Sequence, residues 1–424
     1  MRIFSCLAQR RKDKMKYCRF LQLFAASMLL LLAACGNQTS VVLVPSTPSP
    51  STPSQVTPVV QQPLPKSLLN PKYPVMDWVY NVTCGRAVDS YSRSQMDATI
   101  AYDSAAWLSP SDGHLVEGSS DCDKGALISQ ARNQGLLTLL TVGVDSSWWS
   151  TRDLAQYIDV ASSQQQVPCT PEATTYVCKI VNWAITGGYA GVIIDFELVK
   201  WDYPGIRMKF GMFMQELQAA LHQKGMLCGV TLIPKASDSA AEDPHKLEYF
   251  QDWKLLSRID FLVIMVLDLD LVLNKPGPIT TAPWIEKQLN YLWKTIPQAL
   301  SKTIWEFPLY GREWQQNANG KWSPMSDETC QQASNQKAAQ TVLSGVSRDP
   351  TTPEIAWNDQ NGNRHEVWYS TASSLVAIMT QIQGTVRTLL KDSHYKLPTS
   401  FWYRGSECAN FFGAANALQE FYKS

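Results

Sequence analysis

Eight apolar segments of strand length recur along residues 71–424, and they constrain the fold more than any other feature. They are VMDWVYNV (75–82), ATIAYDSAAW (98–107), LLTLLTVGV (136–144), AGVIIDFEL (190–198), MLCGVTLIP (226–234), FLVIMVLDL (261–269), TIWEFPLYG (303–311) and TSFWYRG (399–405). Most are nearly continuous and rich in β-branched residues. This pattern is typical of strands that are buried on both faces, as in a parallel sheet.

Helical periods lie between most of these segments. The clearest covers 205–224 and ends at Gly225, and its apolar face contains Phe210, Phe213, Leu217 and Leu221. Further helices are predicted at 123–133, 176–186, 245–257, 282–295 and 370–388. The alternation favours an α/β fold, a (β/α)8 TIM barrel with insertions. A doubly wound open sheet is the alternative, but without a Gly-x-Gly-x-x-Gly after the first segment it lacks a dinucleotide site.

The N-terminus has the features of an export signal. Basic residues up to Arg19 precede an apolar run from Phe20 to Ala34, which is shorter than the ~20 residues of a spanning helix. The run ends in Leu-Ala-Ala-Cys and resembles a bacterial lipobox, whose cysteine is diacylated and becomes the mature N-terminus. We therefore expect a lipoprotein signal peptide at 1–34 and lipidation of Cys35. A plain signal peptide and an uncleaved anchor are the alternatives, and Met15 is an alternative start.

A linker follows the predicted lipidated cysteine. Residues 35–70 are rich in Pro, Ser and Thr and show no helical period, as expected of a semi-rigid extended segment. At ~3.1 Å per residue it would hold a domain up to about 100 Å from the membrane. We expect the domain at 71–424 to lie outside the cytoplasm, attached to the cell membrane or envelope by the lipid.

Charge and aromatic content narrow the expected partners. The chain has 37 basic and 37 acidic residues. Residues 1–34 hold seven basic residues and one acidic residue, so the remainder has an excess of six acidic residues. A nucleic-acid partner is not expected, because such proteins usually carry a basic excess. The 15 Trp and 16 Tyr fit a large core and also sugar binding by stacking.

Two carboxylates end the fourth apolar segment. Asp195 and Glu197 follow Gly191-Val192-Ile193-Ile194, and the alternation of side chains along a strand places both on one face, roughly 7 Å apart. Acids at the mouth of an apolar barrel can take different pKa values, so that one donates a proton while the other stays charged. A role as helix caps is the structural alternative.

This segment resembles a known family. GVIIDFE is similar to the Asp-x-x-Asp-x-Asp-x-Glu strand of glycoside hydrolase family 18, the chitinase-like barrels. Residues 276–297 most resemble the subgroup that includes spore-cortex and peptidoglycan-acting members. Five other segments resemble family segments in the same chain order: LLTVGV (139–144), IMVLD (264–268), FPLYGREW (307–314), VWYSTASSL (367–375) and SFWYRG (400–405).

The resemblance implies substrate-assisted hydrolysis, an exception to the usual scheme with two carboxylates. By position, Glu197 would be the general acid and later the base. Asp195 would hold the acetamido N–H of the sugar and stabilise the developing positive charge. The substrate would be an N-acetylated polysaccharide, chitin or peptidoglycan, and neither a metal nor another cofactor is expected. We expect a monomer.

Three positions depart from the family pattern. Ala190 and Ile193 stand where the family has two of its aspartates, and Leu267 stands where it has a tyrosine that donates to the acetamido carbonyl. A donor of that type contributes ~2–4 kcal/mol to transition-state stabilisation. We therefore expect a slow or specialised enzyme. A chitin- or peptidoglycan-binding, lectin-like barrel with little catalysis is the main alternative, and a structural envelope protein or adhesion receptor is the third.

Eight other residues are candidates for substrate binding. The resemblance assigns Trp402 to the floor of the reacting-sugar site and Asp268 to contact with the sugar or the acid. The remaining candidates follow strand ends: Tyr80, Tyr310, Trp314 and Trp148, the last with Trp149 and Trp201. Packing or loop anchoring is the alternative role for the aromatic residues, and an ordinary loop cap is the alternative for Asp268. The choice between endo and exo cleavage is left open, because it depends on whether loops such as 315–366 close the cleft.

Seven cysteines fall within the predicted domain, and an exported domain of this kind is expected to contain disulfides. Neighbouring loops of a barrel would bring Cys84 to Cys122 and Cys330 to Cys408, while Cys169 and Cys178 are close in sequence. Cys228, in the apolar run LCGVTL, is expected to be the buried free thiol. Without a cysteine–histidine cluster of zinc spacing, a metal site is not expected.

Overall fold

The computed structural model describes the part of the chain that carries the predicted strands and helices. The described residues are 74–79, 100–108, 115–117, 124–133, 135–145, 154–155, 158, 169–171, 175–197, 205–237, 251–333, 354–402, 406–408, 411 and 417–424. They belong to one unit, Gln61–Ser424. The predicted signal peptide, Cys35 and the linker at 35–70 all lie outside the described residues.

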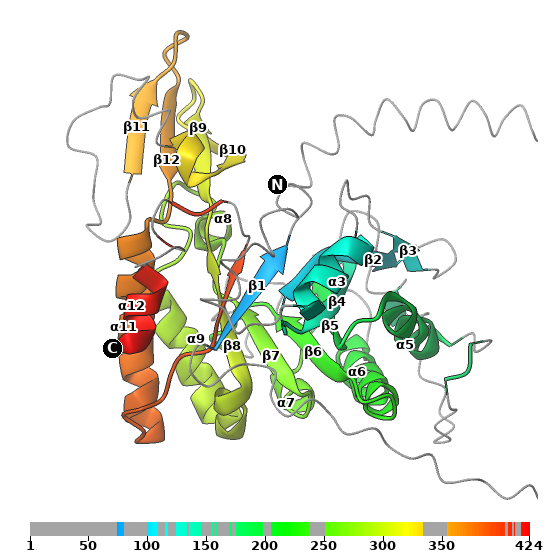
Figure 1. The fold of residues 1–424 in the computed structure, drawn as a ribbon. Coiled ribbons are helices and arrows are strands. Elements are labelled where there is room, and N and C mark those ends of the chain that lie inside the picture. Colours follow the sequence, from blue (N-terminus) through cyan, green and yellow to red (C-terminus); the bar gives the residue numbers. More distant parts are fainter. Residues whose placement is uncertain are drawn as a thin grey trace, which may run out of the picture. The chain divides into compact units, whose positions relative to one another are not determined.

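A parallel sheet forms the centre of this unit (Figure 1). Among the described residues its strands run in the order β1-β13-β8-β7-β6-β5-β4-β2-β3, and β1 also pairs with β2. All pairs are parallel except the antiparallel pair of β2 with β3. The strands are β1 (Val75–Val79), β2 (Ile100–Leu108), β3 (Leu115–Glu117), β4 (Thr138–Asp145), β5 (Gly191–Glu197), β6 (Leu227–Leu232), β7 (Phe261–Met265), β8 (Thr303–Pro308) and β13 (Thr399–Trp402).

Each of the eight predicted apolar segments contains one of the parallel strands, so the prediction of a parallel sheet with helices is confirmed. The physical reason is burial on both faces. On β5, Val192, Ile194 and Phe196 belong to a large core that also contains helix residues. Ile193, between them, belongs to a second core built from strand residues alone: Met76, Trp78, Leu139, Ile193, Leu227, Phe261, Val263 and Ile304. We call the face that carries this second core the inner face of the sheet.

Helices cover the other face, and most begin where the periodicity predicts. They are α3 (Lys124–Asn133), α5 (Tyr176–Gly187), α6 (Ile206–His222), α7 (Trp253–Leu256), α8 (Leu269–Leu273), α9 (Ala282–Thr295), η2 (Pro297–Lys302), α11 (Ala372–Leu390) and α12 (Ala417–Lys423). Threonine side chains cap three of them, because a hydroxyl oxygen can accept a free N–H of the first turn: Thr175 caps α5, Thr281 caps α9 and Thr371 caps α11.

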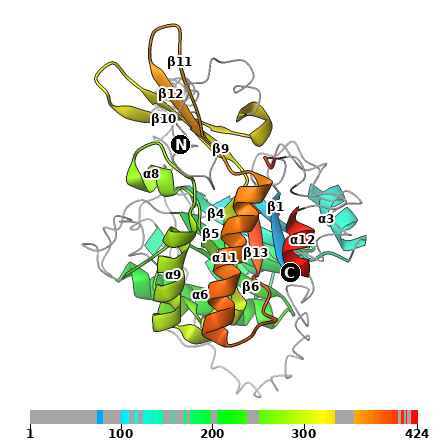
Figure 2. The same ribbon diagram turned by 90° about the vertical axis from the view of Figure 1, so that its left-hand side faces the viewer.

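Helices α9 and α11 lie side by side along the outer face of the sheet (Figure 2). The Gln381 amide on α11 donates to Glu286 on α9 at 2.9 Å.

Helix α6 ends close to Gly225, which adopts the left-handed conformation at φ 70°. Of the predicted helix at 245–257, the described part is α7, since 238–250 lie outside the described residues. No described helix combines the length and apolar character needed to cross a bilayer.

A second sheet of four antiparallel strands lies between β8 and α11 in the chain and was not predicted from the sequence. Its order is β10-β9-β12-β11, from β9 (Gly311–Gln316), β10 (Trp322–Glu328), β11 (Glu354–Asn358) and β12 (Arg364–Trp368). The predicted segment 303–311 is therefore divided between β8 and the start of β9. Gly311 permits this change of sheet, because a Cβ there would lie 2.5 Å from Cβ of Tyr369.

Candidate active site

Strand β5 carries the two predicted carboxylates on the inner face of the sheet. Ile193 belongs to the inner core and is fully buried. Side chains alternate along a strand, so Asp195 and Glu197 share this face. Exposure rises toward the carboxyl end of the strand, from buried Ile193 through partly buried Asp195 to exposed Glu197. The two acids therefore occupy different environments, a condition under which carboxylates take different roles.

Thr231 on the neighbouring strand holds Asp195. Its hydroxyl donates to Asp195 Oδ1 at 2.7 Å, and the threonine is 1 % exposed. Gln251 fixes the end of β6, since its amide donates to the Thr231 carbonyl and its Oε1 accepts from Ile233 N, both at 2.8 Å. The sequence analysis missed Thr231; the available signal was a polar residue at an inner-face position of the apolar run LCGVTL.

Trp402 lies at the end of β13 beside the inner core. It is partly buried and packs against this core. Its ring meets that of Trp78 edge to face, with centroids 5.7 Å apart, a favoured aromatic geometry. The Trp402 ring thus packs against the Trp78 indole and keeps part of its surface accessible. A ring that stacks on a sugar needs such an accessible face.

Asp268 follows β7 in a backbone conformation that is unusual for an aspartate. It has φ 65° and immediately precedes α8. Asp and Asn tolerate this left-handed region better than most side chains. The Tyr310 hydroxyl and Arg312 Nη2 both donate to Asp268 Oδ1, the latter at 2.7 Å. The side chain keeps 36 % of its surface accessible.

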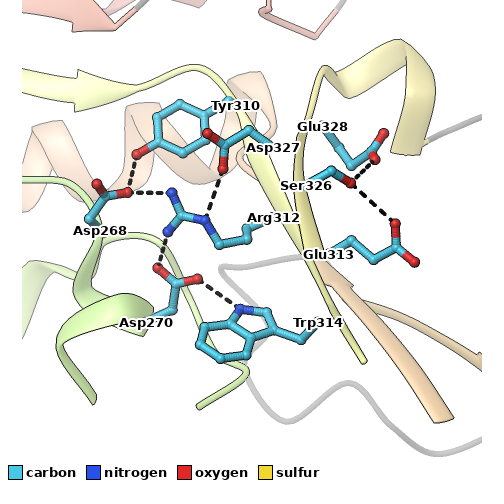
Figure 3. Close-up of polar contacts among 9 residues, drawn as sticks. All are labelled: Asp268, Asp270, Tyr310, Arg312, Glu313, Trp314, Ser326, Asp327 and Glu328. Carbon is cyan, nitrogen blue, oxygen red and sulfur yellow. Dashed lines mark hydrogen bonds and ion pairs between the residues drawn. The ribbon is translucent and has the colours of Figure 1, made fainter. Parts of the chain in front are cut away.

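Arg312 is the centre of a polar cluster that links the β7–α8 connection to the second sheet (Figure 3). Its Nη1 donates to Asp270 at 2.7 Å and its Nε to Asp327 at 2.9 Å. The Trp314 indole donates to the other oxygen of Asp270 at 2.9 Å. We call Asp268, Asp270, Tyr310, Arg312, Trp314 and Asp327 the Arg312 cluster. The sequence analysis missed three members, because Asp270, Arg312 and Asp327 become neighbours only in the fold.

The acids of this cluster differ in pKa. Burial on its own raises the pKa of Asp268, but the charge of Arg312 and the Tyr310 and Arg312 hydrogen bonds outweigh it, and the pKa falls below its usual value. Burial is also the largest influence on Asp270; with the charge of Asp268 it raises the pKa to about 7 against the opposing effect of Arg312. Burial raises the pKa of Tyr310 well above its usual value, so this hydroxyl stays a donor.

Tyr310 and Trp314 lie inside the protein. Tyr310 is 4 % exposed and Trp314 is 0 % exposed, so neither offers a ring face to a sugar. Their polar atoms instead hold Asp268 and Asp270. Their burial does not support the expected role in direct substrate contact, and both residues instead belong to the Arg312 cluster.

The remaining predicted residues are the cysteines, Leu267 and those that lie outside the described residues. Cys169 is bonded to Cys178 and Cys330 to Cys408, as expected, and Cys228 is a buried free thiol whose pKa burial raises. Leu267 is partly buried beside Asp268. Five residues or groups of the predicted site lie outside the described residues: Tyr80, Trp148 with Trp149 and Trp201, Cys84, Cys122 and Cys35.

One more carboxylate belongs to the inner face. Glu306 on β8 is 2 % exposed and pairs in register with Met265 on one side and Ser400 on the other. The sequence analysis did not single it out, since it lies within an apolar segment. Within the described ranges, no group of three His, Cys, Asp or Glu side chains is arranged to hold a metal ion.

Comparison with known proteins agrees with this geometry. No protein-family model matches the chain. A putative sporulation-specific glycosylase of Bacillus subtilis is 27 % identical over 217 residues, which are 50 % of this chain and 48 % of that protein. A cortical fragment-lytic enzyme of Bacillus subtilis is 25 % identical over 226 residues, 53 % of this chain and 50 % of that protein. The chain thus spans about half the length of these curated relatives.

Solved structures have the same fold. A chitinase of Chromobacterium violaceum superimposes with a TM-score of 0.63 at 22 % identity, covering 83 % of this chain and 98 % of that one. The spore cortex-lytic enzyme SleL of Bacillus megaterium gives a TM-score of 0.62 at 18 % identity, covering 82 % and 73 %. These relatives and structures confirm the resemblance to chitinase-like and spore-cortex-lytic glycosidases.

Proposed function

We propose that this protein is a glycosidase that cleaves β-linked N-acetylglucosamine glycans, chitin or peptidoglycan, at the cell envelope. The observation that carries the proposal is the pair Asp195 and Glu197 on the inner face at the end of β5, with Asp195 held by Thr231. The names of the relatives support the class of reaction, since they include glycosylases, cortical fragment-lytic enzymes and chitinases.

The proposed mechanism uses the substrate's own acetamido group. Glu197 donates its proton to the glycosidic oxygen as the bond to C1 breaks, and the acetamido carbonyl oxygen attacks C1 to form an oxazolinium ion. Asp195 accepts the acetamido N–H and stabilises its positive charge. Glu197, now a carboxylate, takes a proton from the water that attacks C1. The oxazolinium ring opens, and the configuration at C1 is retained overall. Glu197 is exposed at the carboxyl end of β5, where a glycosidic oxygen and water can reach it, and Asp195 lies one pleat deeper and is partly buried.

The proposed substrate site extends from β5 to β13 and β7. Trp402, supported by Trp78, would stack under the reacting sugar. Asp268 would accept a hydrogen bond from the sugar through its accessible carboxylate. We extend the fold proposal to a complete (β/α)8 barrel, supported by the pairing of β1 with both β2 and β13. Attachment through lipidated Cys35 and the 35–70 linker, action as a monomer, and further sugar contacts by Tyr80 and Trp148 belong to the same proposal.

A lectin-like barrel with little catalysis is the second candidate. Two observations favour it: Ile193 places an apolar floor below Asp195, and Leu267 has no hydroxyl to orient the acetamido carbonyl. Both candidates bind the same glycans, so binding alone does not separate them.

The test compares the purified full chain with its Glu197→Gln variant on N-acetylglucosamine oligomers and on purified peptidoglycan. New reducing ends are followed by mass spectrometry. Cleavage by the wild type that is lost in the variant is the expected result, and it also identifies the glycan. Retention of both proteins on the glycan without cleavage would establish the lectin-like candidate, and neither cleavage nor retention would contradict both.

A further inference from the structure

One oxygen of Asp268 is left for a ligand by the way the Arg312 cluster holds the side chain. Both donors, the Tyr310 hydroxyl and Arg312 Nη2, bind Oδ1. Oδ2 accepts no hydrogen bond from any described residue, and Figure 3 shows it pointing away from the guanidinium. The direction in which Asp268 presents Oδ2 therefore depends on the position of the Arg312 side chain.

Asp270 fixes that position. Arg312 reaches Asp268 with Nη2 and Asp270 with Nη1, both at 2.7 Å, and Asp327 with Nε at 2.9 Å. The three carboxylates together orient the plane of the guanidinium, and Asp268 and Asp327 are both partly exposed. Asp270 is fully buried, and its second oxygen accepts from the Trp314 indole at 2.9 Å. Both oxygens of Asp270 are thus used as acceptors, and both donors lie on β9 of the second sheet.

We propose that Asp270 is a positioning residue: with Trp314 it fixes the guanidinium of Arg312, which holds Asp268 with Oδ2 directed at the bound sugar. This inference rests on the proposed function, because Asp268 is the residue that would contact the glycan. Two observations support a functional role. Asp268 has a left-handed backbone, and such strained conformations concentrate at functional sites. Burial also makes Asp270 costly to ionise, with a pKa of about 7.

The geometry predicts a specific defect for Asp270→Asn. The amide has one acceptor and one donor end, whereas the site offers two donors, Arg312 Nη1 and Trp314 Nε1. One donor must then face the amide N–H₂, and Arg312 is displaced. Trp314→Phe removes one of these donors, so in the double variant the amide oxygen can accept from Arg312. The effects of the two substitutions are therefore expected to be non-additive.

Glu313→Gln is the matched control. Glu313 lies on β9 next to Arg312, and its carboxylate pairs with His365 at 2.6 Å on the second sheet. Figure 3 shows Glu313 directed away from the guanidinium. This substitution removes the charge of a partly buried side chain on the same strand as Arg312 without touching the Arg312 cluster. It therefore measures the effect of a merely structural change in the second sheet.

Affinity is measured by calorimetry with an N-acetylglucosamine pentamer, with Glu197→Gln present in every protein to prevent turnover. We expect Asp270→Asn to weaken binding roughly tenfold, within the range that a small misplacement causes. Trp314→Phe should restore part of this loss, and Glu313→Gln should leave affinity within about twofold of its parent. Equal affinities for the Asp270→Asn and Glu313→Gln proteins would overturn the inference while leaving the proposed function intact.

Hydrogen exchange by mass spectrometry tests the same inference without any substrate. Val272 N–H bonds to the Asp268 carbonyl and Leu269 N–H to Ile279, so exchange in peptides over 266–275 reports the hold on Asp268. We expect faster exchange there in Asp270→Asn, unchanged exchange in α11, and no change at 266–275 in Glu313→Gln. If the chain neither binds nor cleaves the pentamer, the proposed function fails. Unaltered exchange at 266–275 in Asp270→Asn would overturn the inference as well.

Discussion

Thr231 and Asp195 are joined across neighbouring strands, with the threonine hydroxyl donating to Asp195 Oδ1 at 2.7 Å. The contact closes one side of the candidate active site. A hydrogen bond to a charged group contributes about 1.5–3 kcal/mol. The parallel register of β5 and β6, which extends to Ile194 and Val230, brings the two following side chains together.

Removing this hydroxyl should impair the reaction. In Thr231→Val, Asp195 loses the donor that orients it, and kcat/KM on N-acetylglucosamine oligomers is expected to fall about tenfold, or about 1.4 kcal/mol. Thr231→Ser keeps the hydroxyl and is the control; it should retain most of the activity. Equal rates for the valine variant and the wild type would show that Thr231 does not support Asp195 in catalysis.

Restoring the missing hydroxyl at Leu267 should raise turnover. Leu267 is partly buried, next to Asp268. A tyrosine there would donate to the acetamido carbonyl and stabilise the transition state by ~2–4 kcal/mol where the geometry is ideal. Leu267→Tyr is therefore expected to increase kcat on the oligomers, and Leu267→Phe, which adds the ring without the hydroxyl, is not. An unchanged or lower rate in the tyrosine variant would count against this account of slow catalysis.

The Arg312–Asp268 pair should make stability depend on pH in acid. The pKa of Asp268 is lowered in the folded protein, so the stability contributed by its charge is present above the unfolded pKa of ~3.9 and is lost as pH falls through the folded value. Asp268→Asn, which also tolerates the left-handed backbone, removes this dependence. Urea unfolding should show a gap between wild type and variant that narrows below about pH 4, where Asp268 becomes protonated. A gap that widens in acid would contradict the assigned direction.

The two described disulfides should differ in their effect on stability. Cys330–Cys408 closes a span of 78 residues and Cys169–Cys178 a span of 9. In the chain-entropy model a longer loop gives more stabilisation, about 4–5 kcal/mol against about 2–3. Replacing the Cys330 and Cys408 pair by serine should therefore lower the midpoint of denaturation more than replacing the other pair. A larger loss from the shorter loop would show that local packing, not loop entropy, dominates.

The strand pattern was readable from the sequence because parallel strands are buried on both faces and need continuous apolar residues. All eight segments contain a strand, and the acids of β5 were assigned to one face by alternation alone. The second sheet was not predicted. Strand β10 alternates between partly buried and exposed positions, and the apolar segment 303–311 runs from β8 up to Gly311, where β9 begins.

The sequence by itself determined the class of the fold and the pair Asp195 and Glu197, because both follow from local periodicity. Only the tertiary structure decided what surrounds them. Thr231 reaches Asp195 from 36 residues away in the chain, and Arg312 reaches Asp268 from 44. Tyr310 and Trp314 were expected at the substrate, but the fold buries both within the Arg312 cluster. Contacts of this kind depend on the pairing of strands and sheets, and the local sequence does not encode which distant side chain will arrive.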